Sequence, residues 1–330
     1  MNALCNKLGI KIPILLAPMG GAVGPELTAA VSSAGGLGLI PLWYLEPEVV
    51  RSNIRATRAI TKQPFGVNLN LNWPQEDRLA VCLDEGVTII SFFWGHSTAL
   101  VERAHAAGAT VLQTVSSAEE ARQAIDEGAD IVVAQGWEAG GHVRGTVATL
   151  PLVPAVVDAV APTPVVAAGG IADGRGLAAV LALGASAAWI GTRFLLSDEC
   201  PIHPHYRERL IAANEIGTLY TSLYDVGWPD APHRLLRNST LTDWENAGSP
   251  PAGKRPGEGE VIARSPSAGE IVRYQAYTPG ADATGQIDET AMWAGQGVAL
   301  LKRAQPAGDI VREIWRDASA TLKRVSAASN

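Results

Sequence analysis

Two glycine-rich segments carry the clearest chemical signal in this sequence. Residues 167–174 read AAGGIADG, residues 190–193 read IGTR, and each segment follows a short apolar run. Glycine loops after the last two strands of a barrel expose backbone N–H groups, which bind phosphate. The segments therefore predict a phosphate site, either for flavin mononucleotide (FMN) or for a sugar phosphate. Thr192 can add a hydroxyl group to such a site.

A histidine ends a third glycine-rich segment. Residues 134–142 read AQGWEAGGH and follow the apolar run that begins at Ile131. Histidine is the side chain best suited to exchange a proton near neutral pH. His142 is therefore a candidate catalytic base, and the alternative is an ordinary histidine in a surface loop.

Amide side chains occur at two other predicted strands. Alternation along a strand places Asn68 and Asn70 on one face, where they can bond a heteroaromatic ring or cap the next helix. Gln113 lies within an apolar run, and a buried amide is costly unless it has a partner or ligand. After the first run, APMGG (residues 17–21) allows a flat ligand to approach the backbone, or forms a simple tight turn.

The remaining histidines give weaker signals. His96 follows a predicted strand, where it can contact substrate or cap a helix. His203 and His205 lack a third ligand nearby, so their spacing favours a helix start over a metal site. His105 and His233 are expected at the surface.

Tryptophan outnumbers phenylalanine, nine to four. Trp94 and Trp137 fall at predicted strand exits, where they can line an apolar pocket. Trp228, Trp244 and Trp293 lie in or beside a later segment and are interpreted as packing within it.

Eight short apolar runs must position these residues, and Ala-rich stretches of helical length separate the runs. Each run is apolar on both faces, as in a parallel sheet covered by helices, so residues 1–213 predict a (β/α)8 TIM barrel. A doubly wound open sheet is the alternative. Residues 214–291 lack this rhythm and are expected to cap the barrel mouth and shape the substrate pocket. Residues 292–330 are expected to pack a final helix back on the barrel. The runs begin at Ile12, Gly36, Gly66, Val87, Thr110, Ile131, Pro164 and Ala187.

Composition excludes several classes of protein. The net charge is −7 and no basic patch contains interleaved aromatics, so nucleic acid is not an expected partner. The uncharged stretch 27–45 contains serines, glycines and a proline that argue against a membrane span. Cys5, Cys82 and Cys200 are scattered, which predicts a reduced, cytoplasmic protein without a zinc site. The oligomeric state stays open.

Five motifs, in order, resemble the nitronate monooxygenase family, formerly called 2-nitropropane dioxygenases. They are APMGG, GVNLN, AQGWEAGGH, PVVAAGGIADGRG and GTRFLLSDECPIHP, between about Ile12 and Tyr206. MWAGQGVAL, at residues 292–300, resembles the C-terminal segment of the family. Flavin-dependent enoyl-ACP reductases and an NADH:quinone reductase group share much of this sequence pattern.

The resemblance implies an FMN-binding TIM barrel that oxidises alkyl nitronates, or nitroalkanes, with O2 to a carbonyl compound and nitrite. His142 matches the catalytic base of the family. The implied contacts of the FMN phosphate are Ala168, Gly169, Gly170, Gly191 and Thr192. An NAD(P)H-dependent flavin reductase of a quinone or enoyl thioester is the first alternative, and a flavin-free phosphate-binding barrel is the second. The implied flavin contacts are Pro18, Met19, Gly20, Asn70, Gln113, Gln135 and Gly140.

Overall fold

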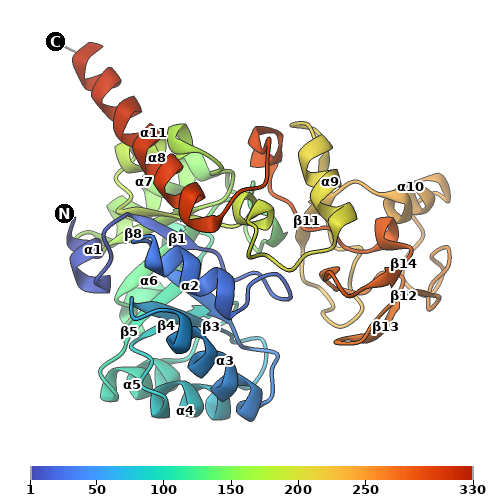
Figure 1. Cartoon of the computed structure of the whole chain (residues 1–330), viewed down its shortest axis with the longest axis horizontal. Helices are drawn as coiled ribbons and strands as arrows, with labels where there is room; N and C mark the ends of the chain where they lie inside the picture. The colour runs from blue at the N-terminus through green and yellow to red at the C-terminus, as the bar shows by residue number, and fades with distance from the viewer. Residues whose placement is uncertain (1, 329–330) are drawn as a thin grey trace.

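The computed structural model describes residues 2–328 and centres on one sheet of eight parallel strands (Figure 1). The strand order is β1-β9-β8-β6-β5-β4-β3-β2, and Leu15 of β1 pairs with Leu37 beside β2. Because the two edge strands meet through this pair, the sheet closes into a barrel. The (β/α)8 prediction is confirmed, and the open-sheet alternative is excluded. The barrel strands are β1 (Ile14–Leu16), β2 (Gly38–Pro41), β3 (Phe65–Asn70), β4 (Ile89–Phe93), β5 (Thr110–Val115), β6 (Ile131–Gln135), β8 (Val165–Ala168) and β9 (Ala187–Ile190).

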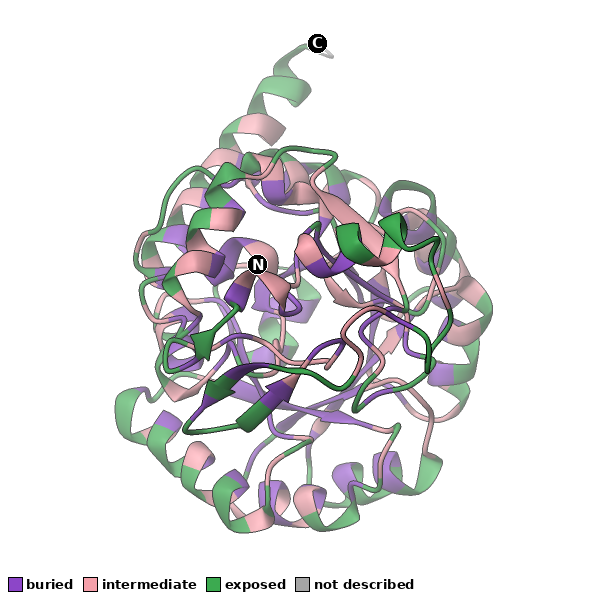
Figure 2. Cartoon of the chain, turned by 90° about the vertical axis from the view of Figure 1, so that its right-hand side faces the viewer, coloured by how far each residue is buried: buried purple, intermediate pink, exposed green. Residues whose placement is uncertain are grey.

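Helices surround the barrel, with their buried residues toward the sheet and their exposed residues on the outside (Figure 2). A short helix, α1, buries Leu4, Cys5 and Leu8 against side chains that fill the barrel interior, so it closes the end opposite the predicted site. The barrel helices are α2 (Pro25–Ser33), α3 (Pro47–Ile60), α4 (Glu76–Asp84), α5 (Thr98–Ala106), α6 (Ala118–Asp126), α7 (Thr149–Val160) and α8 (Gly174–Ala182), with α1 spanning Ala3–Leu8.

Side chains alternate strictly between the inside and the outside of the barrel. In β5, Leu112 packs in the interior cluster, whereas Val111 packs in the cluster beneath the helices. The same alternation runs along the other strands, since successive residues of a strand point to opposite faces. The phase of each strand therefore decides which of its last residues face the barrel mouth.

The chain leaves the barrel pattern after β9 and forms a unit beside it, at the right of Figure 1. We call residues 214–291 the excursion. It contributes to two three-stranded sheets, β10-β11-β7 and β13-β12-β14, and β7 (Gly141–His142) comes from the barrel loop after β6. The elements after β9 are η1 (Thr192–Leu196), α9 (Pro204–Ala212), β10 (Thr218–Thr221), β11 (His233–Leu236), α10 (Ser239–Asn246), β12 (Val261–Ser265), β13 (Gly269–Val272), β14 (Thr284–Gly285), η2 (Ile287–Glu289) and η3 (Gln296–Leu300).

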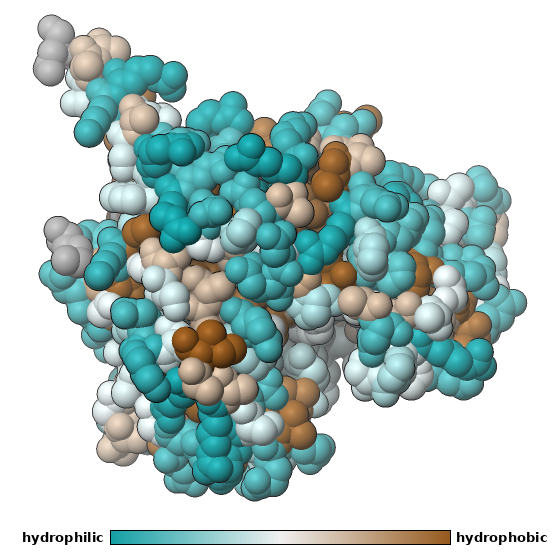
Figure 3. Space-filling model, viewed as in Figure 1, coloured by the Kyte–Doolittle hydropathy of each residue, from teal (hydrophilic) through white to brown (hydrophobic). Residues whose placement is uncertain are grey.

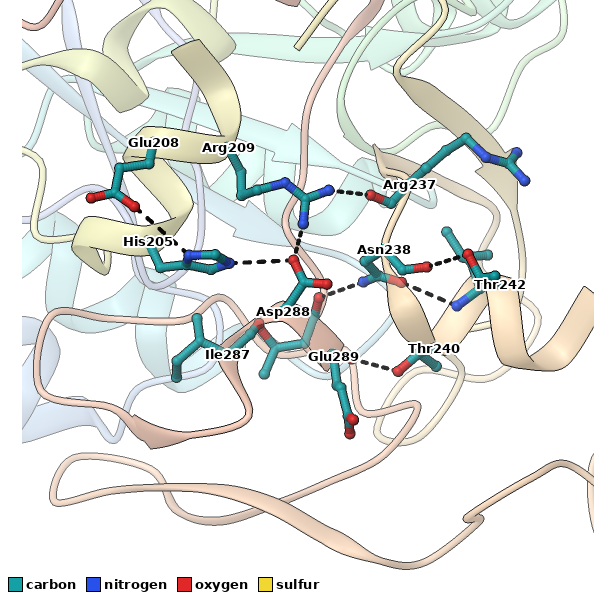
Figure 4. A network of polar contacts seen from close by, with 12 residues as sticks. His205, Glu208, Arg209, Arg237, Asn238, Thr240, Thr242, Ile287, Asp288 and Glu289 are labelled. Carbon is teal, nitrogen blue, oxygen red and sulfur yellow. Dashed lines mark hydrogen bonds and ion pairs between the residues drawn. The ribbon is translucent and has the colours of Figure 1, made fainter. Parts of the chain in front are cut away.

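A polar network joins α9 to the excursion (Figure 4). Asp288 accepts hydrogen bonds from both Arg209 and His205, and Arg209 also donates to the carbonyl of Arg237 at 2.7 Å. Thr240 donates to the carbonyl of Glu289 at 2.9 Å. The contacts of Arg209 and His205 fix the excursion against α9, whereas the Thr240 contact ties α10 to η2 within the excursion.

The last helix, α11 (Ala307–Ala328), packs on α2 and α8. Ile310, Ile314 and Ala318 belong to the same buried cluster as residues of those two helices. A Cβ at Gly174, the first residue of α8, would lie 2.4 Å from the backbone nitrogen of Ala318. Glycine therefore permits the close approach of α11 to α8.

All three cysteines are buried and free. Within residues 2–328, no helix is both long and apolar enough to cross a membrane.

Replacing Gly38 by alanine is predicted to destabilise the barrel strongly. A Cβ there would lie 2.1 Å from the carbonyl oxygen of Thr28, so α2 would have to move. We expect a loss of about 3 kcal/mol or more in the free energy of unfolding, measured in urea. Gly108→Ala is the control, because Gly108 has φ +78° but open space around its Cβ position. Equal losses in the two variants would contradict the close packing of α2 on β2.

Candidate active site

A cavity of about 810 Å³ lies where the carboxyl ends of the strands meet the excursion. Its size suits a cofactor together with a small substrate. The surface in Figure 3 is largely hydrophilic and is hollowed between the barrel and the excursion. In contrast, no Asp, Glu, Lys or Arg side chain lines the cavity in the part of the chain that the structure describes. A charged ligand group must therefore be stabilised there by neutral dipoles.

The structure brings nearly all of the predicted site residues together around this cavity. Gln113 is the exception, since it is not among the lining residues. Those that line the cavity are Pro18, Met19, Gly20, Asn70, Gln135, Gly140, His142, Ala168, Gly169, Gly170, Gly191 and Thr192.

Gln113 lies on the outer face of β5, in phase with Val111 rather than with the interior Leu112. Its amide Nε2 donates to the carbonyls of Gly95 at 3.1 Å and Thr114 at 3.3 Å. A partner was expected for this buried amide, and the backbone supplies it. Thr114, which the sequence argument did not select, lines the cavity instead. Because Leu112 points into the barrel, the residue two positions later, Thr114, points to the same side and reaches the cavity.

The glycine loop after β8 has a backbone shape that other residues adopt only with strain. Gly169 has φ +105° and Gly170 has φ +72°. A Cβ at Gly169 would lie 2.8 Å from the carbonyl oxygen of Gly136. The loop therefore requires glycine for both its backbone shape and the closeness of its neighbours.

A second close approach brings the C-terminal segment to the same place. A Cβ at Gly140 would lie 2.4 Å from the backbone nitrogen of Gly295, and Gly295 donates that N–H to the Thr192 hydroxyl at 3.0 Å. The Thr192 O–H remains available as a donor. Gly295 and Gly297 both line the cavity, and neither was singled out from the sequence as a site residue.

The N-terminus of α8 is occupied by its own cap. The carboxylate of Asp173 accepts hydrogen bonds from the backbone N–H groups of Arg175 at 2.9 Å and Gly176 at 3.2 Å. An anion in the cavity would therefore use the Gly169–Gly170 loop and the start of η1, rather than α8.

The two asparagines at the end of β3 have different partners. Asn68 donates to the hydroxyl of Ser91 at 3.2 Å, across the neighbouring strand. Asn70 accepts from the backbone N–H of Asn72 at 3.0 Å, but its buried Nδ2 has no hydrogen-bond partner among residues 2–328. An unpaired buried donor costs free energy that a ligand can recover. Neither asparagine caps α4, whose N-cap residue is Gln75.

His142 is held by a two-residue ladder between the barrel and the excursion. In β7, His142 pairs with His233 of β11, and Gly141 pairs with Arg234. Gln135, from the end of β6, donates its amide Nε2 to the His142 carbonyl at 3.2 Å. The backbone of His142 is thus fixed from both parts of the protein.

Aromatic rings surround the imidazole of His142. Its centroid lies 3.9 Å from that of Trp228 and 5.3 Å from that of Trp293. Burial, with a smaller effect from His233, lowers the pKa of His142 to about 3. Its buried Nε2 makes no hydrogen bond with any described residue. His142 is therefore a neutral imidazole with a free nitrogen at neutral pH.

His233 is fully buried, so its expected surface position is wrong. Its Nδ1 lies 2.8 Å from the carbonyl oxygen of Ala231, and its Nε2 accepts from the backbone N–H of Tyr224 at 3.2 Å. These partners fix one neutral tautomer. Burial lowers the pKa of His233 to about 4, although Ala231 and Asp225 oppose this shift.

The other histidines lie away from the cavity lining. His203 caps α9 by accepting from the backbone N–H of His205 at 3.1 Å, as a helix start predicts. His96 lies 3.0 Å from Glu127, and His105, which is exposed, lies 2.9 Å from Asp130. The described residues contain no cluster of three or more His, Cys, Asp or Glu that could hold a metal ion.

The tryptophans are arranged differently from the expectation. Trp228 and Trp293 line the cavity, whereas Trp94 and Trp137 are not among its lining residues. Trp137 packs against the guanidinium of Arg234, which lies 4.6 Å from its ring centroid. Trp228 of the excursion and Trp293, just after it, therefore take the wall positions that were predicted for Trp94 and Trp137.

Together these features define an α/β-barrel enzyme whose uncharged cavity combines glycine loops, free amide and imidazole nitrogens and aromatic walls. The sequence model of the nitronate monooxygenase family matches residues 1–77 and 70–317. The chain belongs to this family, whose members, like the related structures, are generally flavin-dependent oxidoreductases.

Relatives differ in their named activities. The chain is 36% identical to a nitronate monooxygenase of Pseudomonas aeruginosa, over 93% of this chain and 96% of that protein. It is 38% identical to (3aS,4S,5R,7aS)-5-hydroxy-7a-methyl-1-oxo-octahydro-1H-indene-4-carboxyl-CoA dehydrogenase of Mycobacterium tuberculosis, over 74% of this chain and 68% of that protein.

Solved structures show the same barrel. FabK from Thermotoga maritima superposes with a TM-score of 0.82 at 31% identity, covering 99% of both chains. Nitroalkane oxidase from Streptomyces ansochromogenes superposes with a TM-score of 0.81 at 30% identity, covering 98% of this chain and 100% of the other.

The two buried histidines predict that stability falls in mild acid. Below pH 6.5 the unfolded chain binds protons at these positions and the folded chain does not, so unfolding becomes more favourable as pH falls. Between pH 7 and pH 5, His233 alone should cost roughly 2 kcal/mol of unfolding free energy. Urea unfolding of wild type and His233→Gln at several pH values measures this.

Glutamine offers both a donor and an acceptor in place of the imidazole, but it does not titrate in this range. The variant should therefore show a shallower loss of stability than wild type as pH falls. Identical pH slopes in wild type and His233→Gln would contradict the lowered pKa of His233.

Proposed function

We propose that this chain binds FMN in the cavity and uses it to oxidise nitronates, and neutral nitroalkanes, with O2 to a carbonyl compound and nitrite. The observation that carries the proposal is the neutral His142, with its unpartnered Nε2, in the same uncharged cavity as the glycine loops. Membership of the nitronate monooxygenase family supports the reaction class.

The residues present fit a flavin phosphate and ring system. Gly169 and Gly170 would hold the phosphate with backbone N–H groups, and Thr192 would add its hydroxyl. Residues 17–20 and Asn70, whose Nδ2 lacks a partner, would border the ring. FMN, when bound, supplies the electron transfer between nitronate and O2. Excursion residues such as Trp228 would form the substrate side of the pocket, and residues 292–297 would complete the phosphate side.

His142 would handle the proton. With a neutral nitroalkane, its Nε2 accepts the α-proton, and the resulting imidazolium lies beside the nitronate anion in a cavity of low polarity. The attraction between the two charges offsets the cost of charging a buried imidazole, which otherwise keeps His142 neutral. With a preformed nitronate no proton needs to be removed, and the neutral imidazole can donate a hydrogen bond that orients the anion. The surrounding indole rings exclude water from this transfer.

Replacing His142 by alanine should therefore separate the two substrates. We expect kcat/KM for nitroethane to fall by roughly 10²- to 10⁴-fold, and for its preformed nitronate by no more than about tenfold. Nitrite release in air measures both. His105→Ala, which removes an exposed histidine outside the cavity, is the control and should match wild type. Equal losses on the two substrates would contradict the role of His142 as base.

Gly169→Ala tests the proposed phosphate loop. The methyl group meets the Gly136 carbonyl and strains a residue at φ +105°, so the purified protein should contain at least about tenfold less FMN. The ratio of flavin to protein absorbance measures this. Gly108→Ala has a similar positive φ without the contact, and it should retain FMN. A folded Gly169→Ala protein with full FMN content would contradict the assignment.

An NAD(P)H-dependent flavin reductase of a quinone or enoyl thioester is the second candidate. It is favoured by the 38% identity to a protein named as a CoA-thioester dehydrogenase. The two functions differ under anaerobic conditions, where NADH should bleach the flavin rapidly only if the second candidate is correct. Slow bleaching together with rapid nitrite release from nitronate in air supports the proposed function.

A further inference from the structure

Three tryptophans from separate segments form one wall of the cavity, which we call the tryptophan wall: Trp43, Trp73 and Trp228. The rings of Trp43 and Trp73 are stacked, with centroids 4.8 Å apart and an interplanar angle of 10°. The ring of Trp228 meets Trp73 edge-on, with centroids 4.8 Å apart. The loops after β2 and β3 and the excursion thus converge on one apolar surface that is built from ring faces and ring edges.

The tryptophan wall is held firmly from behind. Gln75 is buried and donates its amide Nε2 to the carbonyls of Trp43 at 3.3 Å and Asn70 at 2.9 Å, which ties the two barrel loops together. Trp94 supports Trp228 at a centroid distance of 5.1 Å, although its φ of +57° is strained for a bulky residue. The surroundings therefore stabilise a costly conformation that places a further ring against the wall.

A buried arginine fixes the loop that carries Trp228. Arg255 bonds the carboxylate of Asp225 and the carbonyl of Leu223, at 2.9 Å and 3.0 Å, and its guanidinium lies 4.3 Å from the ring centroid of Tyr274. Trp228 donates its backbone N–H to the carbonyl of Asp225 at 3.1 Å. The third indole is thus positioned by contacts outside the cavity, and on the cavity side it packs beside the ring of His142, with centroids 3.9 Å apart.

The electrostatics of the cavity restrict what can lie against this wall. The described lining residues carry no charged side chain, and His142 is neutral. A nitronate group can use the imidazole, but a second negative charge on the substrate would lose its water without gaining a cationic partner. A flat apolar group, in contrast, gains ring contacts and buried area.

We infer that the preferred substrates are nitronates whose carbon substituent is an uncharged ring, aromatic or alicyclic, which packs on the tryptophan wall. Trp73 is then a specificity-determining residue. This inference rests on the proposed function and deepens it by naming the substrate class. Short alkyl nitronates are poorer substrates because they leave the wall uncovered, and nitronates with a terminal carboxylate are poorer because their charge is unpaired.

The activity test compares nitrite release by the flavin-loaded protein from the nitronates of phenylnitromethane, nitroethane and a nitroalkane with a terminal carboxylate. We expect kcat/KM for the ring substrate to exceed that for nitroethane by at least about tenfold. Trp73→Leu should lower this ratio by at least about fivefold. Trp315→Leu, a matched change on α11 outside the cavity, should keep the wild-type ratio. A wild-type preference for nitroethane or for the carboxylate substrate would overturn the inference.

A binding test separates this inference from the proposed reaction. Nitrobenzene and tert-nitrobutane have no α-proton, so calorimetry measures their dissociation constants without turnover. The inference predicts tighter binding of nitrobenzene to wild type and to Trp315→Leu, and loss of that preference in Trp73→Leu. Equal binding of the two compounds to wild type would overturn it. Absence of nitrite from every nitronate would refute the proposed function, whereas nitrite released without ring preference would refute only the substrate class.

Discussion

The two-residue ladder between β7 and β11 is the interaction on which the site depends. β7 lies outside the eight-stranded sheet, and its partner strand belongs to the excursion. The ladder is extended by the backbone N–H of Val143, which donates to the carbonyl of Pro232 at 2.9 Å, and by Arg234, which donates to the carbonyl of Trp137 at 3.0 Å. Without β11, the segment that carries His142 would lose its strand partner and keep the hydrogen bond from Gln135 to the His142 carbonyl. The excursion therefore positions the candidate base as well as lining the cavity with residues such as Trp228.

The described cavity lining carries no charged side chain, and burial in this lining keeps His142 neutral. Indole rings and glycine backbone desolvate the imidazole, and desolvation favours its neutral form. A neutral imidazole can accept a proton or donate a hydrogen bond, whereas an imidazolium could only donate. The same environment strengthens the attraction between any charge formed on the substrate and the dipoles that face it.

The barrel could be predicted from sequence because each strand is a short apolar run and each glycine loop follows directly after one. The predicted strand ends then identified most of the residues at the barrel mouth, including Gly169 and Thr192. Gln113 was misplaced because a polar residue in an apolar strand suggests a ligand, whereas alternation from Leu112 turns it outward. The chemical type of a strand residue and the face of the strand on which it lies are therefore both needed to predict whether it lines the cavity.

The excursion could not be predicted in the same way. Its strands are short and pair with segments distant in the chain, so no periodic pattern reveals them. His233 was expected at the surface because nothing in its local sequence shows that β11 lies between β10 and β7. The roles of Trp228 and Trp293 as cavity walls likewise arise only from tertiary packing.

Oxygen consumption and nitrite release, followed together during turnover of a nitronate with NADH present, test the central claim most directly. The account predicts that nitrite appears as O2 is consumed and that NADH is oxidised no faster than without the nitronate. NADH oxidation coupled to turnover of a quinone or enoyl thioester, without nitrite from any nitronate, would contradict it.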